Sequence, residues 1–137
     1  MKKNLKFLIV ASNFYPEITN GLLSGAIDII KKLNHSYEIA TVNGSLEIPI
    51  KVALKLDKNN YDAVIAIGCI IKGKTDHYEI IASAITNSLL AISVDHKVPI
   101  SNSILTCSNI QQAKTRSSKK INRAKEAVLA VLSVLDN

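Results

Sequence analysis

Tryptophan is absent from this 137-residue chain, and phenylalanine and tyrosine together make up only 4% of it. Proteins that bind single-stranded nucleic acid stack bases on aromatic side chains, so this composition supplies a poor stacking platform. The formal net charge is +6, but the basic residues are scattered rather than clustered. We therefore do not expect nucleic-acid binding, because an anionic small substrate accounts for local basic residues equally well.

Cysteine is scarce, and long apolar runs are missing. Cys69 and Cys107 are too few for a disulfide framework, so we expect reduced thiols and a cytoplasmic location. No apolar run reaches the roughly 18 residues of a transmembrane helix, and we expect no membrane span. The first residues lead directly into an apolar run without a signal-peptide cleavage site, so we expect no secretory leader.

The chain is rich in apolar segments that alternate between strand-like and helix-like patterns. Its length predicts a single domain over residues 1–137, and 47% hydrophobic residues are enough for a core. β-branched runs predict strands at Lys6–Ala11, Tyr37–Val42, Ala63–Ile71 and Pro99–Thr106. Helices are predicted at 18–33, Leu46–Leu56, Asp76–Val94, a short segment after Ser108, and Lys119–Leu135.

Capping signals precede three of the predicted helices. Ser45 is placed to cap the helix that follows it, with Pro49 in the first turn. Asp76 with Glu79, and Ser108 with Gln111, have the spacing of a capping box.

Four strand–helix alternations predict an α/β fold with a parallel sheet covered by helices. Ala63–Ile71 is the most apolar run, which is typical of a central strand buried on both faces. Ligands of such sheets bind outside the carboxyl ends of the strands. The loops that follow the first three strands are therefore the places where a site is expected.

The first two loops contain groups suited to a flat polar ring. Phe14 and Tyr15 follow the first strand, where an aromatic side chain either stacks on a heteroaromatic ligand or covers the edge of the core. Gly44 and Ser45 follow the second strand, where helix N–H groups either hold a carbonyl-rich ring or form an ordinary capped turn.

The third loop, Lys72–His77, combines a glycine, two lysines and a hydroxyl at a helix start, which predicts a phosphate cradle. It lacks the Gly-x-x-x-x-Gly-Lys spacing of a P-loop. The helix dipole favours neutral His77, whereas a bound phosphate favours its charged form, and this competition suits proton transfer. The alternative is an ordinary surface histidine; His35 and His96 receive no role.

Arginine is rare, since only Arg116 and Arg123 occur among 17 basic residues. The planar guanidinium of Arg116 suits bidentate phosphate binding, and the alternative is a solvated helix end. Within one chain Arg116 is expected to lie away from the third loop, and a site shared between subunits removes this difficulty.

The order of these signals is more specific than any one of them. It is carried by NGSLEIP at 43–49, DAVIAIGCIIKGKTDHYE at 62–79, VPISNSILT at 98–106 and QQAKTR at 111–116, with Asn122 downstream. Together these segments resemble the signature of the lumazine synthase family, most specifically in Gly-x-Thr-x-His-Tyr, and the likeness covers almost the whole chain.

The resemblance implies a flavodoxin-like three-layer sandwich with a four-stranded parallel sheet. It implies a homopentamer, or a 60-subunit shell of twelve pentamers, with active sites between neighbouring subunits, and association with riboflavin synthase. It also implies a transferase that joins 5-amino-6-(D-ribitylamino)uracil to 3,4-dihydroxy-2-butanone 4-phosphate. The product is 6,7-dimethyl-8-ribityllumazine, phosphate and water are released, and neither cofactor nor metal takes part.

The resemblance also implies residue roles. His77 is then the catalytic proton-transfer residue, Phe14 stacks on the pyrimidine, and Arg116 of the adjacent subunit meets the phosphate. The other implied substrate contacts are Ser45, Leu46, Glu47, Cys69, Ile70, Ile71, Lys74, Thr75 and Asn102. In this list, the residues from Ser45 to Ile71 border the pyrimidine and its ribityl chain. Lys74 and Thr75 bind phosphate, and Asn102 comes from the adjacent subunit.

Four positions depart from the family pattern. Asn102 stands where an aromatic residue is usual, Lys74 replaces a small or acidic residue, and Asn13 replaces a common arginine. Ser117–Arg123 lacks the usual glycines and is one residue shorter, which puts loop mobility or contacts between pentamers in doubt.

Two other functions stay open from the residues alone. A non-catalytic flavin or lumazine binder would keep Phe14, would not need His77 or Arg116, and would purify coloured. A flavodoxin-like regulatory module would bind a protein partner and need no concave site, although the acidic cluster and lysine of a phospho-accepting receiver are not evident.

Overall fold

The computed structural model describes residues 4–74 and 77–136. Its four strands are β1 (Lys6–Ser12), β2 (Ser36–Val42), β3 (Ala63–Ile71) and β4 (Ile100–Cys107). All neighbouring strands pair in parallel, in the order β2-β1-β3-β4. This is the strand order of a flavodoxin-like sheet, so the predicted fold class is confirmed.

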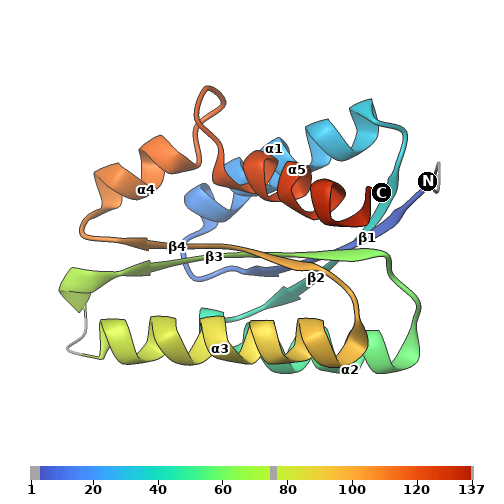
Figure 1. The fold of residues 1–137 in the computed structure, drawn as a ribbon. Helices are drawn as coiled ribbons and strands as arrows, with labels where there is room; N and C mark the ends of the chain where they lie inside the picture. The colour runs from blue at the N-terminus through green and yellow to red at the C-terminus, as the bar shows by residue number, and fades with distance from the viewer. Residues whose placement is uncertain (1–3, 75–76, 137) are drawn as a thin grey trace.

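The helices cover both faces of the sheet. The α-helices are α1 (Pro16–Lys32), α2 (Ile48–Lys58), α3 (Tyr78–His96), α4 (Ile110–Arg116) and α5 (Arg123–Leu135), and the 3-10 helices are η1 (Ser45–Glu47) and η2 (Lys72–Lys74). Figure 1 shows α1, α4 and α5 on one face and α2 and α3 on the other, which gives three layers. No helix in the described part of the chain is long and apolar enough to cross a membrane.

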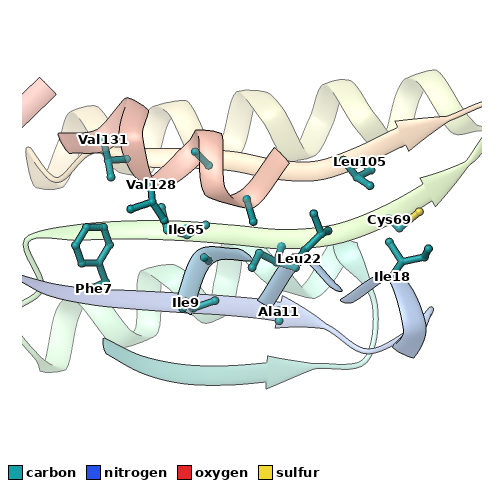
Figure 2. Close-up of a cluster of buried hydrophobic side chains, with 14 of the residues drawn as sticks. Phe7, Ile9, Ala11, Ile18, Leu22, Ile65, Cys69, Leu105, Val128 and Val131 are labelled. Atoms are coloured by element: carbon teal, nitrogen blue, oxygen red, sulfur yellow. The ribbon is translucent and has the colours of Figure 1, made fainter. Parts of the chain in front are cut away.

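Each face of the sheet has its own hydrophobic core. Ile65 and Ile67 of β3 point towards α1 and α5, where they join Phe7, Leu22 and other apolar side chains (Figure 2). The alternate residues of β3 join the core beneath α2 and α3. Eight of the nine residues of β3 are buried, which confirms it as a central strand.

Two helix starts differ from the prediction because other side chains cap them. Asn109, not Ser108, caps α4: its side chain accepts from Gln112 N at 2.9 Å, and Gln112 Oε1 accepts from Ser108 N at 2.8 Å. Helix α5 begins at Arg123 rather than Lys119 because the Asn122 side chain accepts from Ala124 N and Lys125 N.

Two further predicted starts need correction. Ser45 does not cap α2, because it lies within η1 and no side chain caps either helix; Pro49 does lie in the first turn of α2. Helix α3 begins at Tyr78 with His77 in the N-cap position, and the predicted capping residue Asp76 lies outside the described residues.

Candidate active site

A cavity of about 320 Å³ lies where the loops after β1 and β2 meet the carboxyl end of β3. We call it the three-loop cavity because it lies where the first three strands end. Seven of the substrate contacts that the resemblance implied line it, namely Phe14, Ser45, Leu46, Glu47, Cys69, Ile70 and Ile71. Tyr15, Gly44 and Ile81 complete the lining. The rule that ligands bind at the carboxyl ends of parallel strands therefore located a concave, largely apolar surface.

The two adjacent aromatic residues differ in which of the two expected roles, covering the core edge or stacking on a ligand, their position allows. Tyr15 is partly buried and packs against the core beside α1, so it covers the core edge. Phe14 is 68% exposed and meets Tyr15 edge to face, with ring centroids 5.1 Å apart. Most of the Phe14 ring is therefore accessible to solvent at the rim of the cavity.

The contact between the second loop and the sheet depends on a missing side chain. Ser12 Oγ at the end of β1 lies 3.4 Å from Ser45 Oγ in η1. A Cβ atom built on Gly68 would lie only 2.7 Å from each of these hydroxyl oxygens. Glycine at 68 therefore lets both hydroxyl groups lie against β3, which brings the second loop down onto the sheet.

The cysteine in the wall is a neutral group. Cys69 is buried, and burial together with the neighbouring Cys107 raises the pKa of its thiol to about 12. Burial and the nearby Cys69 also raise the pKa of Tyr15. Because the thiolate is the nucleophilic form, Cys69 lines the cavity without being an activated nucleophile.

The third loop is described in part. Lys72–Lys74 form η2, directly after β3. His77 is exposed at the start of α3, and its carbonyl oxygen accepts from Ile81 N at 2.9 Å. The predicted phosphate ligand Thr75 and the side chain of Lys74 lie outside the described residues, so the structure does not place them.

Arg116 and Asn102 line a different hollow, along the edge strand β4. This arginine hollow, of about 390 Å³, is bordered by residues 101–106 of β4, Arg116, Arg123, Glu126, Ala127 and Ala130. Arg116 Nη1 donates to Cys107 Sγ at 3.4 Å. Asn102 is held by Thr86, to whose Oγ1 it donates at 3.2 Å, and its Oδ1 accepts from Ile104 N.

Sequence reasoning missed three contributors to these sites. Arg123 borders the same hollow as Arg116, and the closeness of the only two arginines was the available signal. Ser12 and Gly68 lie against Ser45, a residue of the cavity lining, and determine how closely it approaches β3. No local pattern distinguishes a buried serine or a strand glycine with such a role from an ordinary one.

Fold and cavity together define a small-molecule-binding α/β domain of the flavodoxin-like class. A family model described as 6,7-dimethyl-8-ribityllumazine synthase matches residues 4–137. The chain is similar to proteins of that name from Buchnera aphidicola, at 42% identity over 98% of this chain and 87% of the relative, and from Bartonella tribocorum, at 37% over 98% and 92%. It therefore belongs to the 6,7-dimethyl-8-ribityllumazine synthase family, whose members are enzymes of riboflavin biosynthesis.

Proposed function

We propose that this protein condenses 5-amino-6-(D-ribitylamino)uracil with 3,4-dihydroxy-2-butanone 4-phosphate to give 6,7-dimethyl-8-ribityllumazine. The primary amine attacks the ketone and forms an imine with loss of water. Elimination then releases inorganic phosphate, and the ribityl nitrogen closes the second ring with loss of another water. The reaction needs no redox step and no cofactor, so the protein's task is to align two substrates and move protons.

The observation that carries this proposal is the three-loop cavity, which has an exposed aromatic ring at its rim and a helix start beside it. A pyrimidine stacked on Phe14 would reach the backbone amides at the start of η1, where helical N–H groups have no partner within the helix. Ser45, Leu46 and Glu47 then contact the pyrimidine and its ribityl chain. The apolar wall of Cys69, Ile70 and Ile71 completes the enclosure.

His77 is the proposed proton-transfer residue. It is exposed in the N-cap position of α3, immediately after the proposed phosphate ligands Lys74 and Thr75. A histidine changes its charge near neutral pH, so in this position it can remove a proton from the attacking amine and deliver one during elimination.

The proposed phosphate site needs a second copy of the chain. Arg116, Arg123 and Asn102 border the arginine hollow, and none of them lines the three-loop cavity of the same chain. A closed ring would place the arginine hollow of one subunit beside the third loop of the next, at every interface. We propose a homopentamer as the minimum active unit; a 60-subunit shell is the larger alternative.

The surface supports such assembly. Large apolar side chains are exposed on the outer helices α2 and α3, namely Ile50, Leu54, Ile80, Leu90 and Val94. Exposed apolar patches of this kind are typical of protein–protein contacts.

We further propose that residues 1–137 act as one domain and that riboflavin synthase is a partner. We also propose that the enzyme is cytoplasmic, in agreement with two free buried thiols.

The decisive experiment mixes both substrates with purified protein and follows lumazine absorbance together with inorganic phosphate. We expect the two products to appear in equal amounts, and each substrate alone to yield neither. Coloured protein without turnover would contradict the proposal and favour a non-catalytic lumazine or flavin binder. Light scattering coupled to gel filtration distinguishes pentamer from shell.

A further inference from the structure

The segment between α4 and α5 is a tight turn that separates the two arginines of the arginine hollow. Arg116 is the last residue of α4 and Arg123 the first of α5. Ser117 and Asn122 form an antiparallel bridge across the turn, so its two ends lie side by side. Both arginines consequently border the same hollow.

Asn122 joins this turn to α1. Its Nδ2 donates to the carbonyl oxygen of Gly21 at 2.9 Å, and also to those of Ser117 and Ser118 at 3.3 and 3.2 Å. Its Oδ1 caps α5 at the same time. The side chain is only 6% exposed, so these partners replace water for both of its polar atoms.

The turn packs closely against helix α1 because two residues of α1 are glycines without side chains. A Cβ atom on Gly21 would collide with the carbonyl oxygen of Ser117, and one on Gly25 would collide with the side chain of Asn122. Neither glycine has a positive φ. These glycines are therefore required for close approach and not for backbone conformation.

Two serines close the turn through hydrogen bonds of their own. Ser117 Oγ donates to Ala113 O at 2.8 Å, and Ser118 Oγ donates to Thr115 O at 2.7 Å while accepting from Ile121 N. These bonds hold the turn internally. Only Asn122 donates from the turn to α1 among the hydrogen bonds of the described residues.

We infer that Asn122, seated against Gly21 and Gly25, is a positioning residue that fixes Arg116 and Arg123 relative to each other and to the sheet for binding the substrate's phosphate group. The inference rests on the proposed function, because it assumes that the arginine hollow receives that phosphate. Misplacing a charged group by about 1 Å is enough to weaken such a contact strongly.

The test compares Asn122→Ser with Asn109→Ser. Serine retains capping in both variants, but only the first removes the bond to α1, since Asn109 caps α4 without contacting α1 through a hydrogen bond. For Asn122→Ser we expect the KM of the sugar phosphate and the inhibition constant of inorganic phosphate to rise about 10-fold, with the pyrimidine KM changed less than about 2-fold. Asn109→Ser should leave all three near wild type.

Gly25→Ala disturbs the same contact from α1, and we expect the same selective loss of phosphate affinity; Ser24→Ala is its control on the same helix. Equal rises in both KM values, unchanged phosphate inhibition in Asn122→Ser, or failure of both test variants to fold would each overturn the inference and leave a purely architectural role. An Arg116→Ala variant with unchanged sugar-phosphate KM would instead overturn the proposed phosphate site, and the positioning role with it.

Discussion

The three-loop cavity and the arginine hollow are built in different ways. Two loops, the end of β3 and Ile81 of α3 line the cavity within one chain, and the thiol of Cys69 in its wall has a pKa raised to about 12. The hollow lies open along the edge strand β4. There Arg116 Nη1 donates to Cys107 Sγ, and Arg123 Nε lies 3.9 Å from Glu126 Oε2. The cavity is thus a concave, largely apolar surface formed by one chain, whereas the hollow is a more polar groove bordered by two arginines and Glu126.

His77→Ala tests the proposed proton transfer at the start of α3 and has the largest expected effect. We expect kcat to fall by about 10- to 1,000-fold, because proton transfer is one of several contributions to the rate. Both KM values should change little. Steady-state kinetics against a His35→Ala control measures this, and a wild-type kcat in His77→Ala would remove His77 from the mechanism.

Arg116→Ala tests the hollow alone. Loss of a charge-assisted contact of about 2 kcal/mol should raise the KM of the sugar phosphate about 30-fold and leave the pyrimidine KM nearly unchanged. Arg116→Lys keeps the charge but not the planar guanidinium group, so its KM for the sugar phosphate should lie between those of the wild type and Arg116→Ala. Equal effects on both substrates would assign Arg116 a structural role.

Mixed assemblies test whether the two regions come from different chains. His77→Ala and Arg116→Ala proteins are dissociated, mixed and reassembled, so that about one quarter of the interfaces carry both native groups. At low sugar-phosphate concentration we expect activity about 8-fold above that of the Arg116→Ala parent, given the expected 30-fold KM effect. No recovery in rings that mass spectrometry shows to be mixed would contradict a shared site.

Phe14→Ala tests the cavity alone and mirrors Arg116→Ala. Removing a stacking contact of about 1 kcal/mol should raise the pyrimidine KM about 5-fold, with the sugar-phosphate KM unchanged. Phe14→Tyr retains the ring and should behave like the wild type. If Phe14→Ala instead lowers the melting temperature without changing either KM, the ring belongs to the core and not to the site.

A histidine far from both regions gives the smallest effect and serves as their control. His96 Nε2 lies 3.1 Å from Asp57 Oδ1, and this hydrogen bond, with one to Ile92 O, raises the pKa of His96. Its contribution to stability is therefore full below the pKa of the unfolded chain and disappears as pH rises through the folded value. We expect the Tm difference between wild type and His96→Ala to be larger at about pH 5 than at about pH 9. The reverse order would contradict the pairing, and kcat should not change.

The strands, and the lining residues Phe14 and Ser45, followed from signals in the sequence, whereas the other implied substrate contacts in the cavity lining were expected only from the family resemblance. Ala63–Ile71 is apolar on both faces, and that pattern alone marked it as central. Phe14 and Ser45 were found because parallel strands place their carboxyl ends together, so positions far apart in the sequence share one edge.

Helix starts and the β4 side of the molecule were less predictable. Ser108 and Asn109 are both good capping residues, and the choice between them depends on which one the backbone presents to Gln112 N. Helix α5 starts at Arg123 because Asn122 Oδ1 caps it, and the same side chain is held in place by a bond from its Nδ2 to the carbonyl oxygen of Gly21, 101 positions away. Long-range contacts of this kind leave no periodic signal in a single sequence.

The close approach at Gly68 ties together three positions that are distant along the chain. Serine at 12 and serine at 45 fit against β3 only while position 68 has no side chain. A methyl group at 68 requires both hydroxyl groups to move, so a substitution at 68 is coupled to positions 12 and 45 at once. The position of Ser45, which lines the cavity, thus depends on three residues together, and a change at 12 or 68 alters how closely the second loop packs on β3.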